Sequence, residues 1–397
     1  MSNMADSFTE VTTQSWFSRI GGAFKGIIGG IVLFLVSFPL LWWNEGRAVQ
    51  TYRSLQEGRG AVVSVPSSPP DPANDQKLVH TSGLATTDET LRDPLLGVSA
   101  QAIRLERKAE TFQWAEEQKS ETRKKVGGSE ETVTTYNYEK KWSEKRVESE
   151  SFRDPAGHVN PPVLRVESGS WQASNVRVGG FQLSDRLISK IARAERMAAA
   201  QEAIDRLSEE LRPEARLFDH GIYIGADPGN PQVGDVRVTF NKVPPADVSV
   251  IAQQTGSRLG PFQTRAGDSL EMLEAGILPA DAMFASADRA NTTLTWGLRA
   301  LAFLLMMMGV GLALRPLRVL ADVVPIAGTI VGIGLGFISF AVAAPLTLAT
   351  IALAWIAHRP VLGVGLLILG AALGGWLAIR AARKRRVVKG APEASLA

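Results

Sequence analysis

Residues 26–43, with the sequence GIIGGIVLFLVSFPLLWW, contain no charged residue, and polarity returns at once in the following NEGRA, residues 44–48. Eighteen uncharged residues that end in two tryptophans are typical of a helix that crosses a bilayer and leaves it at an aromatic belt. A cleaved signal peptide would have a shorter apolar run and small residues at its exit. We therefore interpret the stretch as a retained span.

Three further apolar segments, 296–314, 323–357 and 361–379, lie near the C-terminal end of the chain. The middle one has 35 residues. As a straight helix it would be about 52 Å long, whereas the hydrocarbon core of a bilayer is about 30 Å thick. We expect it to tilt or to kink at Pro345, and two short passes are the alternative. The sequence thus predicts one span over 26–44 and a block of three helices over 295–379.

Charge distinguishes the large middle region from the two ends of the chain. Residues 295–397 contain ten basic and two acidic residues, a net charge of +8, whereas residues 1–44 sum to zero. Because the whole chain carries +3, residues 45–294 carry −5. The positive-inside rule then predicts that 1–25 and the basic tail 380–397 are cytoplasmic, with the acidic region in the periplasm or lumen. The basic pI describes the membrane flanks and gives no support for nucleic-acid binding.

The region 45–294 is predicted to be one large α+β domain inserted between the first span and the three-helix block. Alternating apolar residues favour strands over 61–65, 132–142, 217–224, 233–243, 247–253 and 262–265. A change of parity between Leu105 and Phe112 indicates a bulge or a bend, and the charged stretch 116–131 suggests an exposed hairpin loop. Apolar residues at helical spacing predict a long helix over 184–211, capped by Ser184, and short helices over 269–275 and 280–287.

The polar residues 1–25 precede the first span. Val11, Trp16, Phe17 and Ile20 can share one face of a helix that lies on the membrane surface. A partly disordered tail is the alternative.

Glycines recur at four-residue spacing in three of the four apolar segments, and such a strip lets another helix approach closely. We predict helix packing at Gly22, Gly26, Gly30, Gly328, Gly332, Gly336, Gly370 and Gly374. A nucleotide-binding loop is the other interpretation of the glycines near residue 332. Helix packing is favoured because they lie inside an uncharged span.

The residues at the exit of the first span are the sharpest polar candidates for a site. Glu45 and Arg47 follow Trp42 and Trp43, so we predict that all four lie at the external membrane interface. The two charged groups could bind lipid head groups or fix the first helix against the domain. An ordinary charged helix exit is the simpler interpretation.

One acid, Asp322, lies on the predicted cytoplasmic side of the membrane block, and we expect it to pair with Arg315 or Arg318.

A transporter would place ionisable groups in the middle of its spans. Arg299 lies near the end of the second span, where its side chain can reach the interface. This pattern counts against conduction by a single subunit.

The sequence contains no cysteine and four dispersed histidines, His80, His158, His220 and His358. None of them has a second ligand four residues later, and no nucleophile elbow or phosphate-binding loop is present. We therefore predict no catalytic, metal-binding or cofactor-binding residue and no enzymatic activity.

The chain resembles the LUMA family of four-pass membrane proteins over nearly its whole length. The resemblance is carried by 38–49, FPLLWWNEGRAV, by 231–238, PQVGDVRV, and in the membrane block by 315–317, RPL, 346–348, LTL, and 358–360, HRP. One span, a large domain and then three spans is also the order of the family. For eukaryotic members the resemblance implies residence in the endoplasmic reticulum and inner nuclear membrane, beside lamins and emerin-type proteins.

The high Ala, Gly and Arg content is typical of bacteria, where a lamin-linked role has no counterpart. What the resemblance implies there is a membrane-organising scaffold that self-associates. We expect a non-enzymatic protein of the bacterial inner membrane whose partners are the lipid bilayer, further copies of itself and other membrane proteins. A subunit of an oligomeric pore or of a transport or envelope-stress system is the alternative.

Overall fold

The computed structural model describes residues 6–359, and these divide into two compact units. The first, here called the β unit, comprises the residues up to Ser15 together with 53–125 and 129–288. The second, the helical unit, comprises 16–52, 126–128 and the residues from Arg289 onward. The predicted fourth span, 361–379, with Gly370 and Gly374, and the basic tail lie outside the described residues.

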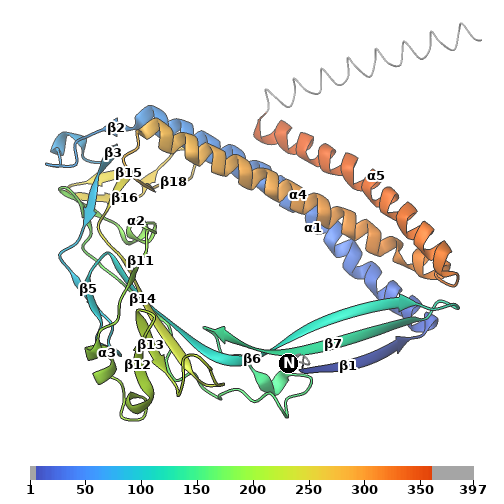
Figure 1. The fold of residues 1–397 in the computed structure, drawn as a ribbon. Helices are drawn as coiled ribbons and strands as arrows, with labels where there is room; N and C mark the ends of the chain where they lie inside the picture. Colours follow the sequence, from blue (N-terminus) through green and yellow to red (C-terminus); the bar gives the residue numbers. More distant parts are fainter. Residues whose placement is uncertain (1–5, 360–397) are drawn as a thin grey trace, which may run out of the picture. The chain divides into compact units, whose positions relative to one another are not determined.

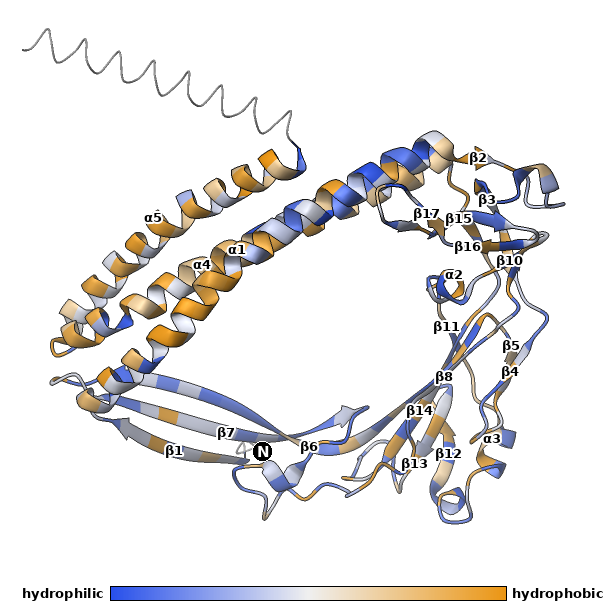
Figure 2. Ribbon diagram, turned by 180° about the vertical axis from the view of Figure 1, so that it is seen from behind, coloured by the Kyte–Doolittle hydropathy of each residue, from blue (hydrophilic) through white to orange (hydrophobic). Residues whose placement is uncertain are grey.

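Three long helices dominate the structure: α1 (Trp16–Ala61), α4 (Ala280–Ala321) and α5 (Pro325–His358). Each is long and apolar enough to cross a membrane, so residues 6–359 contain three candidate spans. α1 and α4 run side by side and are polar toward the end near β2 and apolar elsewhere (Figures 1 and 2). The prediction of an apolar N-terminal helix is confirmed, and three of the four predicted spans fall on described helices.

Two predictions about the later spans can be compared with these helices. The apolar residues 323–357 form the single helix α5 with Pro345 inside it, so the alternative of two short passes is wrong. The short helix predicted over 280–287 is the first part of α4, which continues without a break into the span.

The helices pack closely where glycine allows it. A Cβ added to Gly30 would lie 2.7 Å from the carbonyl oxygen of Gly309, so the backbones of α1 and α4 touch at this pair. Gly22, Gly26 and Gly336 have open space around them among the described residues. The predicted glycine strip on α1 is therefore in contact at one of its three positions.

Eight strands form the first sheet of the β unit, in the order β1-β7-β6-β14-β13-β12, with β8 paired to β6 and β11 to β14. These strands are β1 (Asp6–Gln14), β6 (Arg104–Lys124), β7 (Glu130–Ser143), β8 (Gly169–Gln172), β11 (Glu195–Met197), β12 (Ala215–Phe218), β13 (Gly221–Ile224) and β14 (Val236–Val243). As the alternation in the sequence predicts, Val236, Val238 and Phe240 of β14 are buried.

Seven strands form the second sheet, in the order β19-β15-β16-β10-β9-β3-β2, and β15 also pairs with β3. They are β2 (Val63–Ser64), β3 (Leu78–Thr86), β9 (Arg177–Val178), β10 (Phe181–Leu183), β15 (Ala246–Thr255), β16 (Arg258–Gly260) and β19 (Met272–Ala275). Because of the additional pair, β3, β15, β16, β10 and β9 close into a ring around buried side chains such as Phe181 and Val250. Two small hairpins, β4 (Thr90–Arg92) with β5 (Ser99–Gln101) and β17 (Phe262–Gln263) with β18 (Ser269–Leu270), complete the unit.

The β unit contains much less helix than predicted. The long helix expected over 184–211 is replaced by α2 (Asp185–Ser189), the strand β11 and α3 (Gln201–Asp205). Ser184 does cap the first piece, because its side chain accepts a hydrogen bond from the backbone of Leu187. Leu187 is buried in one core cluster and Ile204 in another, and the chain between them is used to pair with β14. The helix predicted over 269–275 is also wrong, since these residues form β18 and β19.

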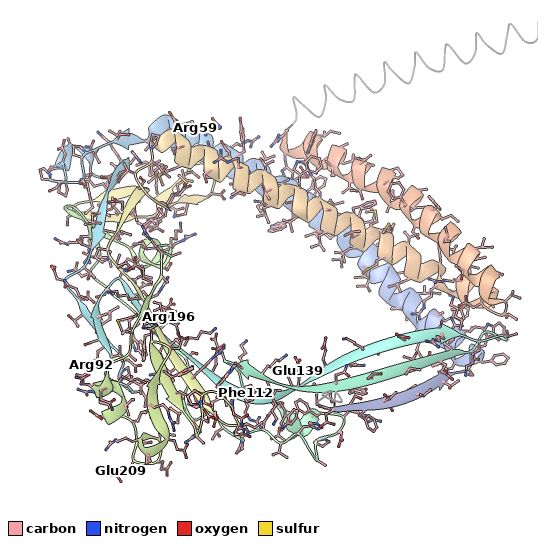
Figure 3. The ribbon with its side chains drawn as sticks, in the orientation of Figure 1. Arg59, Arg92, Phe112, Glu139, Arg196 and Glu209 are labelled. Carbon is pink, nitrogen blue, oxygen red and sulfur yellow. The ribbon has the colours of Figure 1, made fainter. Side chains whose placement is uncertain are left out.

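The hairpin of β6 and β7 is longer and more regular than predicted. Its ladder pairs every residue from Thr111 with Ser143 to Lys124 with Glu130, so 116–131 is mostly paired strand and not an exposed loop. Hydroxyl and charged side chains form the cross-strand contacts near the tip, where no apolar face is required. The pairing registers of β6 with β14 and with β7 run without a break, so the predicted bulge is also absent from the described strand. Phe112, labelled in Figure 3, packs against Trp142 on the second face of β6.

The first residues of the described chain form the strand β1 rather than a surface helix. β1 pairs antiparallel with β7 from Asp6 opposite Tyr138 to Gln14 opposite Glu130. Strand pairing requires both segments to lie in the same compartment, because no open strand edge is tolerated within the hydrocarbon layer. This pairing joins Asp6–Gln14 to β7, whereas the charge pattern predicts that 1–25 and 45–294 lie on opposite sides of the membrane. Charge counting contains no information on strand partners.

Candidate functional site at the exit of the first span

Glu45, one of the predicted interface residues, is buried at the contact of the three long helices. Its carboxylate accepts hydrogen bonds from Nε and Nη2 of Arg299 on α4, at 2.6 and 2.8 Å. It also accepts a hydrogen bond from the indole Nε1 of Trp355 on α5, at 2.7 Å. The side chain of Glu45 is 2% exposed and that of Arg299 13%. One carboxylate thus joins all three helices.

Aromatic rings surround the positive partner of this ion pair. The guanidinium of Arg299 lies 4.7 Å from the ring centre of Trp296 and 5.7 Å from that of Trp355. A forked guanidinium–carboxylate pair with cation–π contacts is among the stronger electrostatic arrangements in proteins. Removing only one charge of such a buried pair costs about 3–5 kcal/mol, because the other charge is left uncompensated. We call Glu45, Arg299, Trp296 and Trp355 the Glu45 cluster.

Arg47, about half a turn beyond Glu45, extends the polar contacts along α1. Its guanidinium donates to Oδ1 of Asn291 at 3.0 Å and to Oγ1 of Thr295 at 2.9 Å, both on α4. Asn44 donates to the backbone carbonyl of Thr295 at 3.1 Å, and Asn291 to that of Ala48. These residues fasten α1 to α4 immediately beyond the apolar part of both helices.

Trp42 and Trp43, the two tryptophans of the predicted interface, are exposed, whereas Glu45 is buried. Trp42 and Trp43 are 44% and 57% exposed, as expected of an aromatic belt. The ring of Trp42 meets the imidazole of His358 edge-on, with 5.6 Å between centroids. A Cβ on Gly46 would come within 3.0 Å of the same imidazole, so glycine is needed where His358 lies against α1.

A second buried ion pair lies near the start of α1. Nη2 of Arg19 is 2.5 Å from Oδ2 of Asp322, and the two side chains are 6% and 1% exposed. Arg19 also donates to the carbonyl of Gly128, at the tip of the β6–β7 hairpin, and the backbone N–H of Gly127 donates to the carbonyl of Val323. We call Arg19, Asp322 and the hairpin tip the Arg19 cluster.

The Arg19 cluster corrects two predictions made from the sequence. Asp322 pairs with Arg19, not with Arg315 or Arg318, because α1 lies against α4 at this point. Gly328 and Gly332 make room for polar side chains rather than for a helix. A Cβ on Gly328 would clash with the carboxylate of Asp322, and one on Gly332 with the guanidinium of Arg318.

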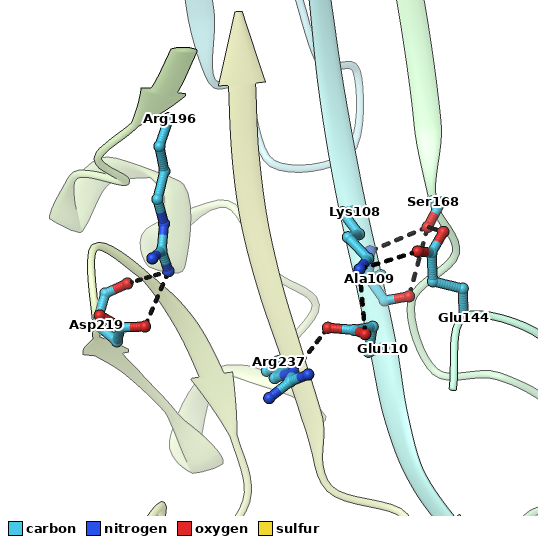
Figure 4. Close-up of polar contacts among 8 residues, drawn as sticks. All are labelled: Lys108, Ala109, Glu110, Glu144, Ser168, Arg196, Asp219 and Arg237. Carbon is cyan, nitrogen blue, oxygen red and sulfur yellow. Dashed lines mark hydrogen bonds and ion pairs between the residues drawn. The ribbon is translucent and has the colours of Figure 1, made fainter. Parts of the chain in front are cut away.

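In the β unit, one face of the first sheet carries a network of charged residues (Figure 4). Glu110 on β6 accepts from Arg237 on β14 at 2.7 Å and lies 3.3 Å from Nζ of Lys108. Burial opposes ionisation of Glu110, but the hydrogen bonds and charges of Arg237 and Lys108 together outweigh it and hold the pKa of Glu110 below the ordinary value. Hydrogen bonds to the carboxylates of Glu144 and Glu110 raise the pKa of Lys108. The network links β6 to β14 and to the residue that follows β7.

The loop after β7 fastens the strand β1. Nε2 of His158 lies 2.9 Å from a carboxylate oxygen of Asp6, and the imidazole stacks on the ring of Tyr138 at 3.8 Å between centroids. Burial and the hydrogen bond to the Glu116 carboxylate raise the pKa of Tyr138 to about 12. Arg153 of the same loop forms an ion pair with Glu10 at 2.7 Å. Both contacts hold β1 against the rest of its sheet.

The motif PQVGDVRV has a structural role in the β unit. Asp235 accepts hydrogen bonds from the Tyr223 hydroxyl at 2.5 Å and from the backbone N–H of Gln232 at 2.8 Å. Burial and the nearby carboxylate of Asp235 raise the pKa of Tyr223. The motif therefore shapes the turn that leads into β14. Within residues 6–359, no group of three or more His, Asp or Glu is arranged to hold a metal ion.

Comparison with known proteins identifies the family. The model of the family Transmembrane protein 43 matches residues 111–360. The chain belongs to the Transmembrane protein 43 family. The human Transmembrane protein 43 is 36% identical over 371 residues, which cover 90% of each chain. The mouse protein is 36% identical over 384 residues, 94% of this chain and 92% of its own. The Drosophila melanogaster Transmembrane protein 43 homolog is 30% identical over 361 residues, 87% and 92% of the two chains.

Membership of the Transmembrane protein 43 family confirms the resemblance read from the sequence motifs. With its transmembrane relatives and three apolar helices, this member is an integral membrane protein. No solved structure matches the chain. The motif FPLLWWNEGRAV contains Glu45 of the Glu45 cluster, and HRP begins at His358, which lies against Gly46.

Sequence reasoning singled out Glu45 and Arg47 but not their partners. The sequence predicts only that the Arg299 side chain reaches the interface. It predicts no polar contact for Trp355, which lies inside an apolar segment. An isolated arginine at one end of a span and an isolated glutamate at the end of another are a signal that could have paired them. Arg19 and Asp322 repeat this signal at the other ends of the same two helices.

Proposed function

We propose that this member of the family is a non-enzymatic scaffold that self-associates and gathers other proteins in its membrane. The observation that carries the proposal is the open edge of the first sheet at β1. This strand is nine residues long, contains no proline and lies at the end of the strand order, where β7 is its one partner among residues 6–359. An open strand edge is a template for pairing with another chain.

The exposed surface of the helices supports the same proposal. Only 17%, 17% and 28% of the most apolar windows of α1, α4 and α5 are buried within one chain. Large apolar side chains such as Ile28, Leu35, Phe337 and Leu348 are exposed along α1 and α5. These faces are available both to lipid and to the helices of other membrane proteins.

The location that we propose is the bacterial inner membrane, with the β unit in the periplasm. It rests on the excess of positive charge in the C-terminal tail. The nuclear-envelope role implied for eukaryotic members is not part of the proposal.

Cysteine crosslinking can test self-association because the natural chain contains no cysteine. Val11 on β1 is 58% exposed. Under mild oxidation in native membranes, we expect Val11→Cys to form a disulfide-linked dimer, because antiparallel pairing of two β1 edges brings the strand centres together. Ser208→Cys, exposed but outside the strands, is the matched control and should stay monomeric.

Scaffolding also predicts that the wild-type protein elutes as an oligomer in mild detergent. A monodisperse monomer with no dimer from Val11→Cys would contradict the proposal. Ion flux through reconstituted liposomes would instead favour the alternative of a pore subunit.

A further inference from the structure

An apolar groove of about 410 Å³ opens between α1 and α5 in the helical unit. Its walls are formed by Phe38, Pro39 and Trp42 of α1 and by Leu346, Ala349 and Leu353 of α5. Thr350 also lines the groove, but its hydroxyl donates to the carbonyl of Leu346 at 2.7 Å within its own helix. The walls therefore present hydrocarbon to whatever occupies the groove.

The end of α5 beyond the groove carries a positive charge. Arg359 follows the last residue of α5, and its guanidinium lies 5.8 Å from the ring centre of Tyr52 on α1. Within residues 6–359, no carboxylate forms an ion pair with Arg359. Glu45, the acid of the neighbouring helix exit, is already neutralised by Arg299. The charge of Arg359 is thus available to an anion from outside the protein.

The spacing of groove and charge matches a membrane lipid. At about 1.5 Å per residue, Arg359 lies about 9 Å beyond Leu353 and about 20 Å beyond Leu346 along the helix. The exposed Trp42 and Trp43 indicate that this end of the helices lies at the head-group level. The groove consequently runs from the interface into the hydrocarbon layer, with its cation at the interface.

We propose that the groove holds one acyl chain of an anionic phospholipid whose phosphate lies at Arg359. A guanidinium donates several N–H groups to phosphate oxygens, and its face can remain on the ring of Tyr52 while it does so. The charge selects an anionic head group, and the apolar walls select the chain. This site does not depend on self-association of the protein.

Mass spectrometry of the intact full-length protein can count bound lipids during titration with phosphatidylglycerol or phosphatidylcholine. We expect wild type to bind one phosphatidylglycerol more tightly than phosphatidylcholine. Arg359→Gln should weaken phosphatidylglycerol binding about fivefold and remove the preference, because one cation at the membrane surface contributes that much. Arg359→Lys should keep the preference, and both variants should melt at the wild-type temperature, since Arg359 lies at the end of its helix.

A variant that fills the groove tests the chain-binding part of the site. Ala349→Trp should lower the affinity for phosphatidylglycerol at least tenfold. Ala352→Trp is the matched control on the same helix, because Ala352 is exposed and lies outside the groove, and it should bind as wild type does. Equal binding of both lipids to wild type, or unchanged selectivity in Arg359→Gln, would overturn the proposal.

A different occupant would be detected by crosslinking in the full chain. In the double variant Ala349→Cys/Gly370→Cys, we expect little disulfide in phosphatidylglycerol-containing membranes. A complete intramolecular disulfide whose yield does not depend on phosphatidylglycerol would assign the groove to residues 361–379 and overturn the lipid site. An intermolecular disulfide from Ala349→Cys alone would assign it to a second copy, with the same consequence.

Discussion

Two buried ion pairs in the described part of the helical unit differ in the groups that hydrogen-bond to them. The Glu45 cluster is built from α1, α4 and α5 alone, and its carboxylate is satisfied by a guanidinium and an indole. The Arg19 cluster uses α1 and the turn after α4, and it also takes a backbone carbonyl from the tip of the β6–β7 hairpin. Among the described residues, the Glu45 end of the helices is thus held by helices only, whereas the Arg19 end also contacts the hairpin tip, residues 126–128.

The largest expected effect concerns which side of the membrane the N-terminal strand occupies. Ser7 on β1 and Ser208 are both exposed residues of the β unit. We expect Ser7→Cys and Ser208→Cys to react with a membrane-impermeant maleimide from the same side, because β1 pairs with β7. Labelling from opposite sides would show that the pairing does not form in the membrane, and the second cluster would then lack its hairpin.

The next largest effect is loss of one charge from the Glu45 cluster. We expect Glu45→Leu to lower the free energy of unfolding by about 3–5 kcal/mol, because Arg299 is left buried without its partner. The double variant Glu45→Leu/Arg299→Met should recover most of this loss. Thermal unfolding of the detergent-solubilised variants measures both, and a double variant less stable than Glu45→Leu would contradict this account of the pair.

The corresponding change in the Arg19 cluster should act on the hairpin as well as on the helices. Arg19→Met leaves Asp322 buried without its cation and removes the hydrogen bond to Gly128. We expect a loss of about 2–4 kcal/mol, together with faster hydrogen exchange at 126–128. Glu45→Leu is the control and should leave exchange at the hairpin tip unchanged. Equal exchange in both variants would mean that the two clusters do not differ in the way described.

Glycine substitutions test the crossing of α1 and α4 between the two clusters. Gly30→Ala places a methyl group against the carbonyl of Gly309 and should destabilise the helical unit by about 1–3 kcal/mol. Gly26→Ala points into open space and should have no destabilising effect. The melting temperatures of the two variants test the contact between Gly30 and Gly309. Equal melting temperatures would refute it.

The smallest effect on stability is expected for Glu110, in the charged network on the first sheet of the β unit. The pKa of Glu110 is lowered in the fold, so its contribution to stability is present above its unfolded pKa and is lost as the pH falls through its folded pKa. Glu110→Gln should therefore lower stability slightly at neutral pH and make unfolding less sensitive to pH below about 4. A pH series of melting temperatures would show this. A steeper acid dependence in the variant would contradict the sign.

The membrane-facing parts of the chain were the most predictable from sequence. An uncharged run long enough to cross a hydrocarbon core has few other physical solutions, so each of the segments 26–43, 296–314 and 323–357 falls on a long apolar helix. The helices α1 and α4 extend well beyond the predicted bounds of their segments. Residues that depend on partners far along the chain were not predictable. Glu45 could be recognised as unusual, but its distance from Arg299 in the sequence hides the pair until α1 and α4 lie side by side.

The β unit shows how tertiary contacts override local patterns. The stretch 184–211 has helical periodicity, yet its apolar residues belong to two core clusters and its middle pairs with β14. The polar residues 116–131 lack an apolar face, yet they form strand because each finds its partner across the hairpin. Neither outcome follows from spacing alone.

The pairing of β1 with β7 also constrains the order of events during synthesis. Glu10 leaves the ribosome early but pairs with Thr134, which is made more than a hundred residues later. At about 5–20 residues per second, the first strand waits on the order of ten seconds without its partner. During this delay α1 is already complete and ready to insert. β1 can therefore pair only if the nascent N-terminus is still accessible when the hairpin has been made.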